Sequence, residues 1–364
     1  MLEVADIFRL HWADYRRQHC FSPPQHRAVE DLMRCRTPAC GGHVWQCDHC
    51  GKMLYSYHSC KNRSCPKCHG QQTQAWLQQA QQRLLPCGYY LLTFTLPQPC
   101  RALARSHPKP IYNLLISSAA AASQKLAWDP GYVGAQLGML AVLHTWTRAL
   151  LYHPHVHLLV SAGGLSKDAQ TWVHPKNPAF LVPGFALSKI FRGKFRAGLQ
   201  KLGLLQELPA DAWKQKWVVH CRHAGSGAKA LEYLARYMFR TAIANSRLES
   251  FENGQVTFRY RDNRTQQLKH IAVPADEFMR RFLWHVLPKG FVKVRSYGLW
   301  SPRSPEKLQR AQSLLSTASP PHPQPPAAPS ANSNAASTPM PCPYCDSGHL
   351  QLIQRLLPQR TRPP

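Results

Sequence analysis

The sequence has few acidic residues and no long apolar run. Only 18 residues are Asp or Glu, against 45 Lys or Arg, and the formal net charge is +27 over 364 residues. The positive charge is spread along the whole chain, which predicts a polyanionic partner such as a nucleic acid. A basic protein without any such partner is the less favoured interpretation, because a field this strong attracts phosphate backbones.

The missing apolar runs argue against a membrane protein. No window reaches the roughly 18 uncharged apolar residues that span a bilayer, and residues 1–7 contain acids and lack the apolar stretch of a secretory signal peptide. We expect a soluble protein of the cytoplasm with no membrane partner. In that reducing compartment the 13 cysteines favour metal binding over a disulfide framework.

Cysteine and histidine are concentrated in residues 40–69. Two Cys-x-x-Cys pairs lie 14 residues apart there, a spacing typical of zinc ribbons, in which each pair forms a tight turn that aims two thiolates at one tetrahedral ion. The first candidates for the ligands of a structural zinc ion are Cys47, Cys50, Cys65 and Cys68. Cys60 and His43 are further candidates, either in place of one of these or for a second ion, and the sequence does not divide the ligands.

A second candidate metal site lies in the stretch HPHVHLLVSAGG, residues 153–164. Successive side chains of a β-strand point to opposite faces, so His153, His155 and His157 lie on one face and Val156 and Leu158 on the other. Imidazoles that face one point on a rigid strand predict a metal site, because imidazole binds several divalent ions. A half-buried strand that carries histidines without a metal is the alternative for such a pattern alone.

The segments around this strand predict the middle of a sheet. Residues 89–97 are apolar and β-forming, and residues 138–146 lead through a short connection into the histidine strand, as in an antiparallel hairpin. Helical spacing is found in residues 71–85, 111–126 and 187–199. The histidines therefore belong to the scaffold and not to a loose loop.

Two tyrosines share one face of a further predicted helix, residues 228–240. Tyr233 and Tyr237 are four residues apart and have Arg236 and Arg240 near them. Alone, this spacing is more often core packing. Beside a metal strand, the two tyrosines become candidate nucleophiles, because a phenol can attack a phosphate whose charge is neutralised.

Taken together, these motifs resemble those of the two-tyrosine HUH transposases of bacterial rolling-circle insertion sequences, over nearly the whole chain. The matching stretches are GGHVWQCDHCGKMLYSYHSCKNRSCPKCHG, LLTFTLP, HPHVHLLVSAGG, YLARYMFRTAIANSRL, VTFRYRD and HVLPKGFVKVRSYGLW. The resemblance implies an α+β fold, in which an HUH-type antiparallel sheet with flanking helices is preceded by a small zinc-binding domain.

Carried over by motif, the resemblance implies that His155 and His157 bind a catalytic Mg²⁺ or Mn²⁺ ion and that Tyr233 and Tyr237 are the nucleophiles. Arg236 and Arg240 would bind the DNA. The third metal ligand varies in such enzymes, and the candidates are His153, His144 and Glu232. The implied reaction is the nicking and transfer of single-stranded DNA, from the element's ends and the target, through 5′-phosphotyrosine links.

We divide the chain into three regions. Residues 1–88 are predicted to form a zinc-binding, DNA-binding domain, and residues 89–316 the two-tyrosine catalytic domain. Residues 317–364 are rich in Pro, Ala and Ser, which predicts a disordered linker that ends in a cysteine-containing tail. Cys342 and Cys345 in that tail either bind zinc with ligands from elsewhere or stay reduced without metal.

Two other functions fit parts of the pattern. A plasmid relaxase or replication initiator would use the same chemistry, but the zinc cluster and the lack of a helicase-like P-loop favour the transposase. A non-catalytic, zinc-dependent DNA-binding protein would bury both tyrosines as packing residues and bind metal only at cysteines. A transposase that uses three carboxylates is disfavoured, since no acidic cluster accompanies the histidines.

Overall fold

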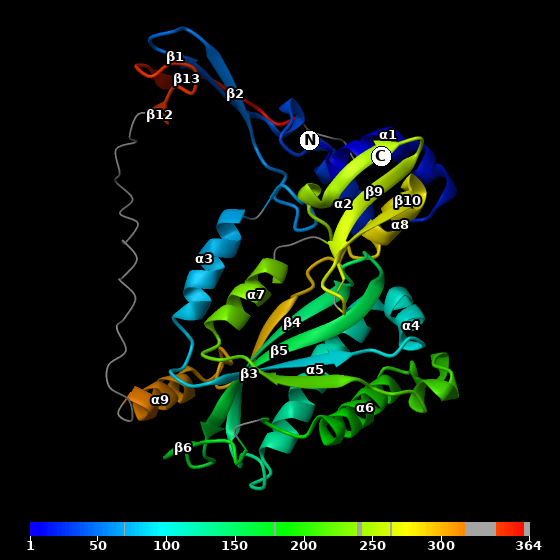
Figure 1. Cartoon of the computed structure of the whole chain (residues 1–364), viewed down its shortest axis with the longest axis vertical. Coiled ribbons are helices and arrows are strands. Elements are labelled where there is room, and N and C mark those ends of the chain that lie inside the picture. The colour runs from blue at the N-terminus through cyan, green and yellow to red at the C-terminus, as the bar shows by residue number, and fades with distance from the viewer. Residues whose placement is uncertain (69, 178–179, 239–241, 263, 317–339, 360–364) are drawn as a thin grey trace.

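The computed structural model describes residues 1–68, 70–177, 180–238, 242–262, 264–316 and 340–359 (Figure 1). A central sheet lies between two layers of helices, and beside it are a smaller unit and a narrow arm. The predicted α+β class, with antiparallel sheets, is confirmed. Within the residues described, no helix is both long and apolar enough to cross a bilayer. Short 3-10 helices occupy Pro38–Cys40, Leu205–Glu207, Ala210–Trp213 and Asn245–Arg247.

The central sheet has the strand order β11-β4-β5-β3-β7, and the short strand β6 pairs with β5. All neighbouring strands are antiparallel, and the predicted hairpin is formed by β4 and β5. The strands are β3 Tyr89–Thr95, β4 Gln136–Trp146, β5 Tyr152–Leu165, β6 Trp172–Val173, β7 Val219–His223 and β11 Val294–Gly298. The histidine strand β5 therefore lies in the middle of the sheet, between β4 and β3.

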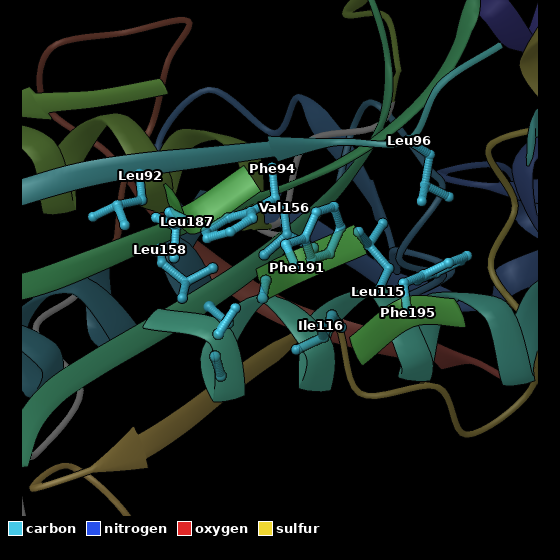
Figure 2. Close-up of a cluster of buried hydrophobic side chains, with 14 of the residues drawn as sticks. Leu92, Phe94, Leu96, Leu115, Ile116, Val156, Leu158, Leu187, Phe191 and Phe195 are labelled. Atoms are coloured by element: carbon cyan, nitrogen blue, oxygen red, sulfur yellow. The ribbon is translucent and has the colours of Figure 1, made fainter. Parts of the chain in front are cut away.

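One face of this sheet packs on the helices α4 Cys100–Ser106, α5 Pro108–Ala127 and α6 Gly184–Lys201. Alternate side chains of β3 and β5 point to this layer, as the strand periodicity predicts, and they include Leu92, Phe94, Val156 and Leu158. Figure 2 shows them against Leu115 of α5 and Phe191 of α6. This core packs on the face of β5 that is opposite to the histidines.

The opposite face carries a second helical layer, formed by α3 Gly70–Gln81, α7 Ala228–Met238 and α9 Pro305–Ser316. Helices α3 and α7 lie side by side (Figure 1). The apolar face of α7 is buried with sheet residues of the other alternation, Tyr89, Leu91, Leu140, Val142 and Leu159. The helix that carries the two tyrosines thus covers the same face of the sheet as the histidines.

The two N-terminal helices, α1 Val4–Gln18 and α2 Pro23–Arg34, belong to the smaller unit. They pack on a later part of the chain, which consists of β8 Leu248–Glu252, β9 Gln255–Arg261, β10 Leu268–Pro274 and α8 Ala275–Leu283. The aromatic rings of Phe8 and Phe282 lie 5.4 Å apart at this contact. The boundaries 1–88 and 89–316 stay a prediction. Helical periodicity shows that α1 has a face to bury but not that a segment after residue 248 covers it.

The arm joins an early segment of the chain to a late one. Its strands are β1 Gly42–Cys47, β2 Met53–Tyr57, β12 Met340–Pro341 and β13 His349–Leu356, in the order β12-β13-β1-β2 (Figure 1). The cysteine-containing tail thus forms strands within residues 340–356, and the part of the predicted disordered linker at 317–339 lies outside the described residues. The sequence did not predict these strands, because their pairing with β1 joins segments far apart in the chain.

We expect Phe8→Ala to lower the free energy of unfolding of the smaller unit by about 3–5 kcal/mol, because Phe8 is completely buried there. Chemical denaturation measures the loss, and amide hydrogen exchange should show faster opening of β9 as well as of α1. Leu10→Ala is the matched control on the same helix, since Leu10 is 66% exposed, and it should change stability by less than about 0.5 kcal/mol. Unchanged exchange in β9 would contradict this assignment of the unit.

Candidate functional site

Three histidines converge on the face of the sheet that α7 covers. His144 on β4 is directly opposite His155 on β5, and His157 follows two residues later on the same face. One nitrogen of each ring lies within 4.8 Å of the others, close enough for all three to bind one metal ion. The sequence proposed three candidates for the third ligand, and the structure brings His144 to His155 and His157.

The other two candidates lie elsewhere. The His153 ring is next to that of His155, but the Arg101 guanidinium donates a hydrogen bond of 2.9 Å to its Nδ1. Glu232 is exposed on α7. Among the described residues, neither belongs to the group of three histidines. Strand pairing explains the outcome, because it joins residues that lie directly opposite each other on neighbouring strands, whereas sequence proximity alone favoured His153.

Hydrogen bonds fix how the ligand rings are turned. Nδ1 of His155 donates to the backbone oxygen of His153 at 2.7 Å, which leaves the lone pair of this neutral imidazole on Nε2. Nδ1 of His157 lies 2.9 Å from Oγ1 of Thr93 on β3. Metal-binding histidines commonly use one nitrogen for the ion and the other for such a second hydrogen bond.

The three imidazoles are neutral at physiological pH. Burial lowers the pKa of His155 to about 4 and that of His157 to about 3, and it lowers the pKa of His144 well below its ordinary value. The charges of neighbouring groups, including Lys293 near His144 and Arg222 near His157, act in the same direction. Neutral imidazole is the form that binds metal, so the site is ready for a divalent ion without losing protons.

The donor set fits a divalent transition metal. Three imidazole nitrogens suit Mn²⁺ or a similar ion better than Mg²⁺, which prefers oxygen ligands. Three protein ligands also leave coordination positions for oxygen atoms of a substrate. Arg222 supplies positive charge beside these positions. Burial lowers the pKa of Lys293 to about 7, and its Nζ lies 4.6 Å from the centre of the Trp146 ring.

Helix α7, whose backbone includes Tyr233 and Tyr237, packs on this face. Its residues Ala230, Leu231 and Leu234 pack on the sheet, and its preceding turn comes very close to the start of β3. Gly227 has φ +83°, and a Cβ there would lie 2.5 Å from the ring of Tyr89, so only glycine fits. The backbones of Tyr233, Arg236 and Tyr237 lie in α7, but their side chains are not among those described, and Arg240 lies outside the described residues.

The cysteines form two groups of four, and within each group the sulfur atoms lie within 4.8 Å of one another. The first group joins the end of α2 to the loop after β2, and its members are Cys35, Cys60, Cys65 and Cys68. The second group joins the early and late segments of the arm and consists of Cys47, Cys50, Cys342 and Cys345. Groups of four cysteines such as these are the ligand sets of structural zinc ions.

The predicted set of Cys47, Cys50, Cys65 and Cys68 is therefore divided between two sites. The reason is the β1–β2 hairpin between the pairs: Cys47 stands at its far end, about 15 Å from its base at ~3.3 Å per residue. Cys60, a further candidate, lies in the first group. Cys35 was not among the candidates, because it follows a helix and has no Cys-x-x-Cys partner.

His43 belongs to neither cysteine group among the described residues. Its ring contacts that of His58, with 4.9 Å between their centres, and also that of Trp45 on the same strand. Its residue type and its position in the cluster made His43 a candidate ligand. On β1, however, its ring lies beside that of His58 and not within a cysteine group. The strand register decides which residues become ligands, and it could not be derived from the sequence.

Two family models match the chain. One, described as a putative transposase, matches residues 138–307, which include β5, α7 and all but the first two residues of β4. The other, described as a transposase zinc-binding domain, matches residues 7–96. The second match contains the whole first cysteine group and only half of the second.

Curated relatives match over most of their length. The putative transposase y4qJ of Sinorhizobium fredii is 39% identical over 340 residues, which cover 87% of this chain and 85% of that protein. The transposase for insertion sequence element IS801 of Pseudomonas savastanoi pv. phaseolicola is 28% identical over 313 residues, 80% of this chain and 74% of that protein. No solved structure matches the chain. The chain belongs to the IS91-type transposases of insertion sequences, which carry a transposase zinc-binding domain at their N-terminus, as its motifs predicted.

Proposed function

We propose that this transposase nicks and transfers single-stranded DNA through 5′-phosphotyrosine links in rolling-circle transposition. The observation that carries the proposal is the packing of α7, with its two tyrosines, on the face of the sheet where His144, His155 and His157 converge. A protein that only bound DNA would have no need of a metal-ligand group on the same face of the sheet as a helix with two tyrosines.

His144, His155 and His157 would hold a divalent ion, for which the nitrogen donors favour Mn²⁺, with Mg²⁺ as the alternative. When bound, such an ion neutralises the oxygens of the scissile phosphate. The sheet keeps the three ligands rigid, and Thr93 holds His157 in the orientation that the site requires. The exposed Arg222 would attract the DNA backbone to this face.

The tyrosine residues would carry the bond exchange. The Oη atom of one tyrosine loses its proton and attacks the phosphorus, the bond from phosphorus to O3′ breaks, and the leaving oxygen takes up a proton as a free 3′-hydroxyl. The phosphate stays on the tyrosine as a 5′-phosphotyrosine, so the energy of the phosphodiester is kept. A 3′-hydroxyl of another strand can then attack this link and release the tyrosine, without water or ATP.

Two tyrosines would allow two such links at the same time. Tyr233 and Tyr237 are one helical turn apart on α7, so both can address one face. One link would hold the donor strand and the other the target strand, which strand transfer requires. Arg236 and Arg240 would bind the DNA beside them. We place this activity in the bacterial cytoplasm, on the nucleoid DNA.

The central test is covalent capture of DNA. We expect labelled single-stranded DNA from the element's ends to migrate with the protein on denaturing gels in the presence of Mn²⁺, and EDTA added before mixing should prevent this. The Tyr233→Phe, Tyr237→Phe double variant should form no adduct, and the single variants assign each role. Tyr260→Phe, on β9, is the matched control and should keep full activity. DNA binding without any adduct would favour the non-catalytic alternative.

Thr93→Val tests whether the histidine group is a metal site. We expect a roughly 10–100-fold loss of Mn²⁺ affinity, measured from the electron paramagnetic resonance signal of free Mn²⁺, because the variant keeps the shape of Thr93 but cannot hydrogen-bond to His157. His153→Gln is the control: its backbone oxygen still accepts the hydrogen bond from His155. An equal loss in both variants would argue against the ligand set proposed here.

The pH dependence of Mn²⁺ binding should follow the lowered pKa values. Because His155 and His157 have pKa values of about 4 and about 3, both are neutral above pH 5, and affinity should be constant from about pH 8 down to about pH 5. It should fall only below that, as protons compete for the ligands. Exposed histidines with a pKa of about 6.5 would already lose affinity between pH 7 and 6, and that profile would refute the buried site.

A further inference from the structure

The second cysteine group connects residues that are almost 300 positions apart. Cys47 and Cys50 lie at the turn between β1 and β2, and Cys342 and Cys345 lie between β12 and β13. The two family matches end at residues 96 and 307, so neither reaches the C-terminal pair. The site is therefore a feature of this chain that the matched domains do not include as a whole.

The sulfur positions match a tetrahedral metal site. Four thiolates at about 2.3 Å from one zinc ion lie about 3.8 Å from each other. The observed separations are 3.7 Å between Cys47 and Cys345 and 3.8 Å between Cys50 and Cys342. A disulfide needs sulfur atoms at about 2.05 Å, so these distances indicate a shared ion and not two oxidised pairs.

Both turns also present their thiols in the same way. The backbone N–H groups of His49 and Cys50 donate to Sγ of Cys47, each at 3.4 Å. On the other side the N–H of Tyr344 donates to Sγ of Cys342, again at 3.4 Å. Such bonds orient and stabilise metal-bound thiolates, so the early and late segments contribute two similar halves of one site.

We propose that Cys47, Cys50, Cys342 and Cys345 bind a second structural zinc ion, which clasps the C-terminal segment to the N-terminal hairpin. The clasped segment comprises residues 340–359. Zinc is the ion of choice because an all-sulfur tetrahedral group is typical of structural zinc sites, with iron as the chemical competitor.

The other contacts of this segment are mainly hydrogen bonds. Its pairing with β1 supplies backbone hydrogen bonds, and the Asp48 carboxylate accepts one from the N–H of His349 at 2.8 Å. At the end of the segment, the N–H of Gln359 donates to the backbone oxygen of Ala39 at 3.1 Å, and the Arg34 guanidinium donates to the backbone oxygen of Gln359. The apolar cluster beneath contains only Leu350 and two of the cysteines as buried members, while Leu352 and Ile353 on β13 are 40% and 49% exposed. With so little apolar burial, the free energy of metal binding must supply most of the attachment.

Gly348 provides a way to disturb the clasp without removing a ligand. A Cβ at this position would lie 2.3 Å from Sγ of Cys47 and 3.1 Å from Sγ of Cys345. Gly348→Ala should therefore push the two halves apart while all four thiols remain. The second cysteine group shares no member with the first group or with the three histidines, so this variant and the cysteine variants should leave covalent DNA capture intact if that activity exists.

The test uses the full chain with a protease site inserted between residues 317 and 339. Native mass spectrometry and metal analysis should find two zinc ions per chain, and after cleavage the C-terminal fragment should stay with the body during size-exclusion chromatography. The Cys342→Ser, Cys345→Ser variant should contain one zinc ion and release its fragment, and Gly348→Ala should release it at least partly. Cys20→Ser, at an exposed cysteine outside both groups, is the control and should behave as the parent.

Three results would overturn the proposal. One is a parent protein with a single zinc ion whose fragment dissociates after cleavage. Another is full retention of the fragment in the double cysteine variant, which would show that strand pairing suffices. The third is stoichiometric iron in the second site, seen by its visible absorption, in protein produced with zinc available. All three readouts are independent of the proposed tyrosine chemistry.

Discussion

The candidate metal centre depends on the register between β4 and β5. Because His144 is paired with His155, a slip by one residue would turn His144 to the opposite face and break up the group. The apolar core on the opposite face of the sheet stabilises that register. There the side chains of Met139, Ala141 and Leu143 are buried under α5 and α6. The apolar core is therefore what keeps polar ligands in position, although it contains none of them.

Because side chains alternate along each strand, one face of the sheet both packs on α7 and carries the candidate metal ligands. Leu91, Leu140 and Leu159 hold α7, and His157 and Thr93 lie further along the same face. Apolar packing at one end of the face thus holds α7 on the same side of the sheet as the metal ligands at the other end. Gly227 permits the close approach with which the helix begins. The position of α7 relative to the three histidines is therefore fixed by the sheet that carries both.

Local patterns predicted the parts of the structure that local physics determines. The alternation in HPHVH gave the faces of β5, and its apolar neighbours gave β3 and β4, because strand geometry acts over adjacent residues. Pairings between distant segments were not accessible: His144 was one candidate among three, Cys35 was missed, and the partners of Cys47 were misassigned. Composition likewise could not show that the tail pairs with β1 or that its two cysteines lie beside Cys47 and Cys50, because neither feature alters composition. The positions of the tyrosine side chains stay a prediction from motif.

The first cysteine group also reaches the candidate catalytic site through a chain of contacts. Arg63, in the loop between Cys60 and Cys65, donates to the backbone oxygens of Phe291 at 2.7 Å and Leu287 at 3.0 Å. That segment continues to Lys293, whose own backbone oxygen accepts a hydrogen bond from the N–H of Leu143 beside His144. These hydrogen bonds tie the cysteine loop to this segment. The fold of the zinc-binding domain is thereby coupled to the position of Lys293 beside His144, across the boundary between the two matched domains.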